Sequence, residues 1–168
     1  MQPKVNFLAW EATWGKALTL DQIKKRRWAL ANRCYFCQVD EESIDHLLLH
    51  CEKTRALWEM FFTLFGVSWV FPSSIRETLL GWNGPFVGKK RKTIWRANPL
   101  CIFWTVWKVR NIISFEDDML SIISFEDDML SIPRLKAFFV YLLWLETKMF
   151  IQDGPSTLFD FIDWVGSH

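Results

Sequence analysis

Three cysteines and one histidine in a short stretch carry the clearest chemistry in this sequence. Two residues separate Cys34 from Cys37, eight separate Cys37 from His46, and four separate His46 from Cys51. A Cys-x2-Cys turn is a common way to bring two thiolates to one ion, and zinc takes four sulfur or nitrogen ligands tetrahedrally. The spacing therefore predicts a structural Zn²⁺ site, with no open position for a reacting water.

The spacing leaves the fourth ligand open. His46 and His50 are four residues apart and share one face of an α-helix, whereas His46 and Cys51 are five apart and about 140° out of phase. Cys51 can join His46 only if the helix ends near it, and His50 is otherwise the rival ligand. The alternative to a metal site is that these cysteines are small buried hydrophobic residues.

The elements around this motif have helical patterns. Gly and Pro are sparse, and the periodicity between them predicts a mainly α fold, a small helical domain with a zinc-knuckle turn between helices. A helix over residues 5–18 carries a wide apolar arc. Asn98 as the N-cap and Pro99 at the first helical position predict the start of the longest helix. Cys101, in the apolar start of that helix, is expected in the core.

The chain divides into three expected segments. Residues 1–66 form the zinc-binding domain, residues 67–97 a linker with a short helix and a basic cluster, and residues 98–168 a tryptophan-rich helical region. Within the third segment, residues 112–121 recur letter for letter as residues 122–131. Ten residues advance a helix by about 1000°, so the two copies cannot present the same face of one helix. We expect a break there.

The composition narrows the classes of function. The 168 residues allow about one compact domain, and a hydrophobic content of 51% is too high for disorder. A net charge of +1 favours neither nucleic acid nor membrane. The longest apolar runs fall short of the roughly 20 residues that span a bilayer, so no membrane partner is expected. The N-terminus lacks a secretion signal, so we expect an intracellular, reducing compartment where thiols bind metal.

Two basic clusters supply the candidate nucleic-acid-binding residues. Their side chains could contact phosphates, and an aromatic ring in the knuckle could stack on an unpaired base. The second cluster also resembles a nuclear-localisation patch, and the alternative for both is an ordinary solvated helix surface. The candidates are Lys24, Lys25, Arg26, Arg27, Arg33, Tyr35, Lys89, Lys90, Arg91 and Lys92.

Groups for catalysis are scarce. The three histidines offer few candidates for acid-base chemistry, and the sequence has no glycine-rich phosphate loop or nucleophile elbow. Residues 115–118 and their copy superficially match the Phe-x-Asp-Asp of a polymerase palm, where carboxylates hold magnesium ions. They lie in a helix-patterned segment, and a solvated acidic face accounts for them. We expect no enzyme.

A longer series of motifs runs through most of the chain: Pro3 to Trp10, Leu18-Thr19, the Cys34 and Cys37 pair, Glu42-Ser43, His46-Leu47, Cys51, Trp58, Ile102 to Trp107 with Lys108, Arg110-Asn111, Phe115-Glu116, and Phe161 to Gly166. Together they resemble the zinc-binding domain at the C-terminal end of plant LINE-type (non-LTR) retrotransposon reverse transcriptases. The resemblance selects His46 and Cys51 as ligands and leaves His50 on the surface.

This resemblance implies a non-catalytic zinc-binding module that binds RNA or DNA. The fingers, palm and thumb of a polymerase are absent from the sequence, and the reverse-transcriptase polypeptide is a second candidate partner. The alternatives are a zinc-stapled helical module for protein interaction and a decayed retroelement fragment with no retained activity. The duplicated segment is extra to the pattern and favours the second of these alternatives.

Overall fold

The computed structural model describes residues 3–26, 32–84, 87–89, 91–116, 131–148, 151 and 154–167, with residues 115 and 116 described by their backbone alone. All regular elements in these ranges are helical, which confirms the expected fold class. In chain order they are α1 (Pro3–Thr13), α2 (Leu20–Lys25), the π-helical segment η1 (His46–His50), α3 (Glu52–Phe65), α4 (Ile75–Leu80), α5 (Lys92–Glu116), α7 (Ile132–Thr147) and α8 (Leu158–Gly166).

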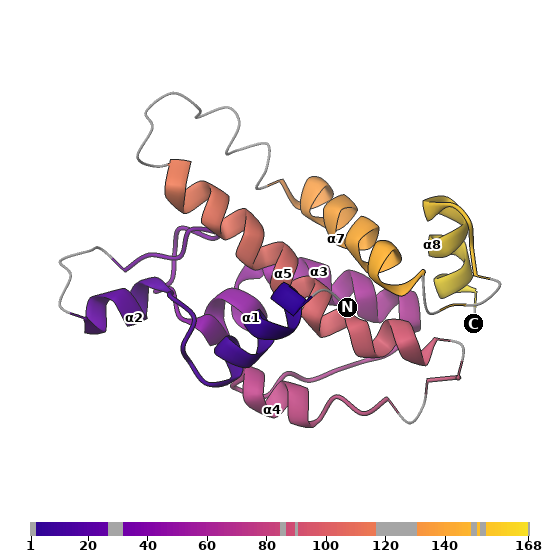
Figure 1. Ribbon diagram of the computed structural model, residues 1–168, viewed down its shortest axis with the longest axis horizontal. Coiled ribbons are helices and arrows are strands. Elements are labelled where there is room, and N and C mark those ends of the chain that lie inside the picture. The colour runs from indigo at the N-terminus through magenta and orange to yellow at the C-terminus, as the bar shows by residue number, and fades with distance from the viewer. Residues whose placement is uncertain are drawn as a thin grey trace.

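The long helix α5 is the centre of the fold (Figure 1). It packs against α7, α1, α3 and η1, while α2 and α8 lie at opposite ends of the molecule. The buried hydrophobic side chains form one cluster that extends from Leu8 in α1 to Val165 in α8. The division of the chain into three segments stays a prediction.

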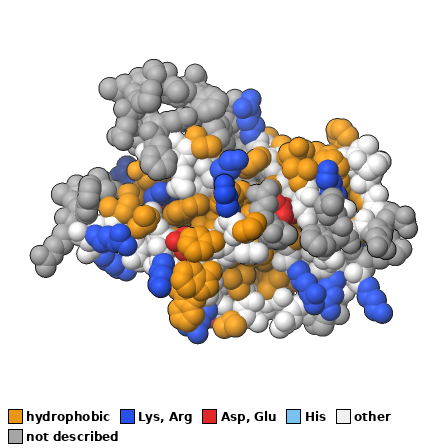
Figure 2. Space-filling view, viewed as in Figure 1, with side chains coloured by type: hydrophobic (Ala, Val, Ile, Leu, Met, Phe, Trp, Pro, Cys, Tyr) orange, Lys and Arg blue, Asp and Glu red, His pale blue; other side chains and the backbone are white. Residues whose placement is uncertain are grey.

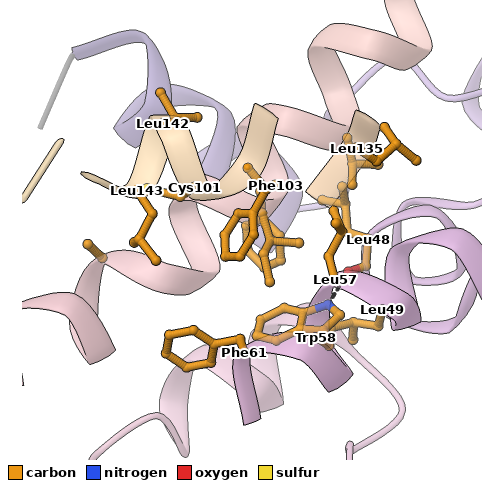
Figure 3. Packing of buried hydrophobic residues seen from close by; sticks show 14 of the residues in the cluster. Leu48, Leu49, Leu57, Trp58, Phe61, Cys101, Phe103, Leu135, Leu142 and Leu143 are labelled. Atoms are coloured by element: carbon orange, nitrogen blue, oxygen red, sulfur yellow. Dashed lines mark hydrogen bonds between the residues drawn. The ribbon is translucent and has the colours of Figure 1, made fainter. Parts of the chain in front are cut away.

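Aromatic side chains dominate the interior. Trp58 and Phe61 of α3 are fully buried, and the ring of Trp58 lies edge-on to the ring of Phe103 of α5, with 6.2 Å between centroids. The indole N–H of Trp58 donates to the carbonyl oxygen of Leu48 at 3.0 Å, so its polar atom is satisfied as a buried indole requires (Figure 3). Cys101 is fully buried in α5, as the sequence predicts.

The start of α5 corrects a prediction. The helix begins at Lys92, and Pro99 lies in its interior. A proline has no N–H for the carbonyl four residues earlier, which is that of Trp95. The indole N–H of Trp82 donates to this oxygen at 2.7 Å, and the two indole rings stack with 4.5 Å between centroids. A tertiary contact therefore replaces the missing helical donor. Asn98 is no N-cap but fully buried, with no hydrogen-bond partner for its side chain among the described residues.

The first helix is shorter than the expected range of residues 5–18. It ends at Thr13, and Gly15 follows in the left-handed region with φ of 62°. Only one side of its apolar arc is buried, through residues such as Leu8 and Ala12. The two tryptophans of the arc, Trp10 and Trp14, are exposed to solvent.

The expected break in the duplicated segment lies outside the described residues, because α5 ends at Glu116 and α7 begins at Ile132. Of the described helices, none combines the length and the hydropathy that a bilayer span requires.

Candidate metal centre

Cys34 and Cys37 lie on a tight turn, as their spacing predicts. The amide of Gln38 donates to the carbonyl oxygen of Cys34 at 2.9 Å, and the amide of Cys34 donates to the carbonyl oxygen of Asp40 at 2.8 Å. Gln38 takes a left-handed conformation with φ of 59°, and its side-chain amide donates to the carbonyl oxygen of Tyr35 at 3.1 Å. These bonds close the loop on which both thiols are carried.

His46 and Cys51 are brought into phase by the π-helical segment η1. The amide of Cys51 donates to the carbonyl oxygen of His46 at 2.6 Å, a bond between residues five apart that an α-helix does not make. The backbone then leaves the helix at Cys51, where ψ is 132°, and α3 begins at the next residue. The wider turn therefore reduces the angular mismatch that α-helical periodicity gives these two side chains.

Side chains of α3 hold the end of η1 in place. The hydroxyl of Thr54 donates to the carbonyl oxygen of Leu47 at 2.7 Å, and the indole of Trp58 donates to the carbonyl oxygen of Leu48. Both donors are buried, so water does not compete for these hydrogen bonds. The position of His46 thus depends on the core packing of α3.

The four side chains converge on one point. The ligand atoms of Cys34, Cys37, His46 and Cys51 all lie within 4.8 Å of one another, and Cys37 Sγ is 3.4 Å from His46 Nε2. A tetrahedral zinc ion with bonds of about 2.3 Å to sulfur and 2.0 Å to nitrogen places its ligand atoms about 3.5 to 3.8 Å apart. The cluster could hold zinc with small adjustments. Cys34 and Cys51 are fully buried, while the other two members are half-buried.

The rival ligand His50 lies elsewhere. Its side chain is exposed, and Nε2 is 3.3 Å from the carbonyl oxygen of Ser73. The group of possible metal ligands among the described residues contains Cys51 and not His50.

The thiols and the imidazole of the cluster perturb one another. A hydrogen bond with Cys51, together with burial, raises the pKa of Cys34 to about 12. The same bond lowers the pKa of Cys51, and the backbone amides of Lys53 and Thr54 in the first turn of α3 lower it further. A hydrogen bond with the sulfur of Cys34 raises the pKa of His46 to about 9. A metal ion must therefore displace protons from this site, because zinc binds thiolates and neutral imidazole.

A buried ion pair ties the metal loop to α5. Arg110 Nη2 lies 2.6 Å from Glu42 Oε1, and Arg110 Nε lies 3.2 Å from the same oxygen. The exposed fraction is 6% for the side chain of Arg110 and zero for that of Glu42. This pair is far more withdrawn from water than the pair of Lys25 and Asp21, whose side chains are 69% and 24% exposed, and it joins positions 68 apart in the chain.

Glu42 also gathers the backbone around the knuckle. Its Oε1 accepts from the amide of Leu20 at 3.0 Å, and its Oε2 accepts from the amide of Tyr35, between the first two ligands, at 3.3 Å. The guanidinium of Arg110 lies over the ring of Tyr35, 5.0 Å from its centroid. Residue patterns did not predict this pairing. The one indication in the sequence was that Glu42 and Arg110 both belong to the motifs that resemble the retrotransposon family.

The candidate nucleic-acid-binding residues do not form one surface. Lys24, Lys25 and Arg26 are exposed at α2, and Arg33 is exposed beside the knuckle. The exposed residues Lys89 and Lys92 lie at the start of α5, near the opposite end of the molecule (Figure 1). Arg27 and Lys90 lie outside the described residues.

Two of these candidates are partly or wholly buried. Arg91 is 8% exposed, and its guanidinium donates to the carbonyl oxygens of Val165 at 3.1 Å and Phe65 at 3.3 Å, in the last turns of α8 and α3. The guanidinium of Arg91 therefore binds carbonyl groups at the C-terminal ends of two helices and is not exposed for contact with a phosphate. Tyr35 is half-buried against Arg110.

Comparison with known proteins agrees with this geometry over part of the chain. Residues 1–58 match the model of the family described as zinc-binding in reverse transcriptase, a segment that contains all four members of the cluster. The match supports a reverse-transcriptase zinc-binding domain in this segment. Neither the curated proteins nor the solved structures gave a match.

Proposed function

We propose that this chain is a non-catalytic zinc-binding module, derived from the reverse transcriptase of a plant LINE-type retrotransposon, that binds RNA or DNA. The observation that carries the proposal is the convergence of Cys34, Cys37, His46 and Cys51 inside the segment that matches the family. Zinc bound by these residues would fasten the knuckle to the junction of η1 and α3.

The donor set supports a structural role for the metal ion. Three sulfurs and one nitrogen complete a tetrahedral shell and leave no position for a water to be activated. Metal-assisted hydrolysis is therefore not expected at this site. In small zinc fingers the binding free energy of the metal is also folding free energy, of order 10 kcal/mol. Residues 32–51, which contain little regular structure apart from η1, are the part of the chain that zinc would order.

Exposed cations near the metal loop support nucleic-acid binding. Lys24, Lys25 and Arg26 project from α2, which follows α1, and Arg33 directly precedes the first ligand. Each phosphate that such a cation neutralises releases counterions from the nucleic acid, which makes binding depend on salt.

Fluorescence anisotropy of labelled single-stranded RNA and DNA, titrated with the zinc-loaded chain between about 50 and 200 mM salt, tests this proposal. We expect binding that weakens with salt. The variant Lys24→Ser/Lys25→Ser should reduce the slope of log K against log salt, by about one for each phosphate that is no longer neutralised. Lys148→Ser, which removes an exposed lysine after α7, is the matched control and should leave the slope unchanged. Absence of binding at the lowest salt would refute nucleic-acid binding.

Docking on the reverse-transcriptase polypeptide is the second candidate function. It is favoured by large apolar side chains that remain exposed, among them Val70 at 92% and Phe159 at 79%. Purified polymerase that retains the zinc-loaded chain, while the RNA titration shows no binding, would replace the first candidate by this one.

A further inference from the structure

The outward face of α1 and the turn that directly follows it carry a row of exposed aromatic rings. Phe7, Trp10 and Trp14 are 59%, 49% and 56% exposed. Spacings of three and four residues place them on one stripe of the helix. The rings of Phe7 and Trp10 are stacked, with 6.0 Å between centroids and 25° between planes. We call these three side chains the aromatic stripe.

The aromatic stripe does not contribute to the buried core of α1. The opposite side of the helix supplies its contribution to the core through Val5, Leu8, Ala9 and Ala12. Single exposed hydrophobic residues are normal on protein surfaces, but three adjacent aromatic rings form an apolar patch of the kind that marks a binding site. The stripe therefore suits a ligand whose flat groups are free to stack on its rings.

Cations lie on the stripe and around it. Lys16 Nζ is 4.9 Å from the ring centroid of Trp10, and the guanidinium carbon of Arg76, from α4, is 5.2 Å from that of Trp14. Figure 2 shows hydrophobic side chains gathered at the position of α1, with Lys and Arg side chains around them and a small patch of acidic atoms directly beside them. Of the acidic neighbours in sequence, Glu11 is half-buried and Glu77 is exposed. The two cations that lie directly on the rings, Lys16 and Arg76, are complementary to a polyanion.

We propose that the aromatic stripe is a base-stacking surface for single-stranded RNA or DNA, an inference that rests on the proposed function. Every base has a π face that can stack on an aromatic ring, while Lys16 and Arg76 are placed to contact phosphates. Trp14 directly follows α1, and its amide still donates to the carbonyl oxygen of Trp10 at 3.2 Å, so the helical rise carries on to it. Phe7 and Trp14 are therefore about 10 Å apart along the helix axis, which is the length of about three nucleotides stacked 3.4 Å apart.

The cations favour this ligand over an apolar protein groove. A groove that covered the aromatic stripe would take Lys16 and Arg76 out of water without an opposite charge, and buried unpaired charges are costly. The phosphates of a nucleic acid pair with them instead. A duplex offers phosphates but keeps its bases stacked inside, so the stripe should distinguish single strands from duplexes.

The test uses the full zinc-loaded chain and a labelled oligouridine of about 16 nucleotides, followed by fluorescence anisotropy at several salt concentrations. We expect Trp10→Ala and Trp14→Ala each to weaken binding about fivefold or more, since stacking on an aromatic side chain contributes at least that factor per base. The salt dependence should not change, because no cation is removed from a phosphate. Trp10→Phe should retain most of the affinity. Phe159→Ala is the control and should bind as the parent chain does, because Phe159 lies on α8, at the end of the molecule and away from α1 (Figure 1).

The outcomes separate this inference from the proposed function. Loss of oligouridine binding in the alanine variants, with circular dichroism and zinc content unchanged, supports the stripe. A parent chain that binds no oligouridine at low salt overturns the proposed function and this inference together. Undiminished binding by Trp10→Ala and Trp14→Ala overturns the stripe alone. Sedimentation that shows a dimer for the parent and a monomer for Trp10→Ala also overturns it, because the stripe would then be a protein interface.

Discussion

Replacement of Arg110 by Met tests whether α5 holds the metal loop. Met fills much of the same volume and removes only the guanidinium, so the carboxylate of Glu42, which has no exposed surface, is left with two neutral backbone donors. Breaking a buried ion pair by removing one partner costs about 3 to 5 kcal/mol. We expect a loss of about 3 kcal/mol in the free energy of unfolding, at the low end because Leu20 and Tyr35 still donate to the carboxylate.

Urea denaturation of the zinc-loaded chain measures this loss. Arg96→Met is the matched control, because Arg96 lies on the same helix but is exposed, and it should change the free energy of unfolding by no more than about 0.5 kcal/mol. Because Glu42 accepts from an amide between the first two ligands, Arg110→Met should also weaken zinc binding by about tenfold, measured by competition with a chelator.

The double variant Glu42→Gln/Arg110→Met completes the test. A neutral amide at position 42 removes the stranded charge, so the double variant should lose at least about 1 kcal/mol less than the sum of the two single losses. A loss below about 1 kcal/mol for Arg110→Met, or additive effects in the cycle, would refute the role of this ion pair as the link between the metal loop and α5.

Two further predictions follow from the core and from the metal cluster. Trp82→Phe keeps an aromatic ring but leaves the carbonyl of Trp95 without its donor beside Pro99, so thermal unfolding should show a loss of about 1 to 3 kcal/mol; an unchanged midpoint would mean that the bond is dispensable. The raised pKa values of His46 and Cys34 should stabilise the metal-free fold. This stabilisation is complete below the pKa of the unfolded state and is lost as pH rises, between 6.5 and about 9 for His46 and between 9.0 and about 12 for Cys34. Zinc requires the deprotonated ligands, so the increase in melting temperature on adding zinc should be larger at about pH 9 than at about pH 6.5, and a smaller increase at the higher pH would contradict the assignment.

The metal ligands show how far local sequence patterns reach. Spacing singled out Cys34, Cys37 and His46, which the structure brings together, because a Cys-x2-Cys turn is a local structure. Spacing could not decide between His50 and Cys51 as the fourth ligand, because α-helical periodicity favours His50 and the π-helical turn reverses that preference. This turn is held by donors on α3 that reach back over seven and ten residues. The resemblance selects Cys51, the residue that lies in the cluster, where periodicity did not.

The prediction for the start of α5 failed for a related reason. Asn98 followed by Pro99 satisfies the local rules for a helix start. These rules assume that a proline in a helix leaves a carbonyl unpaired, and here the indole of Trp82 pairs it from 13 residues away. The ion pair between Glu42 and Arg110 was out of reach for the same reason, since no local rule links positions that only the tertiary fold brings together.

Cobalt substitution followed by absorption spectroscopy tests the proposed metal centre most directly. We predict one ion per chain, bound tetrahedrally by three thiolates and one imidazole. Cys51→Ser should reduce the thiolate charge-transfer intensity by about one third, and His50→Ala should leave the spectrum unchanged. A chain that takes up no stoichiometric metal ion, or a two-thiolate spectrum that His50→Ala abolishes, would contradict this assignment.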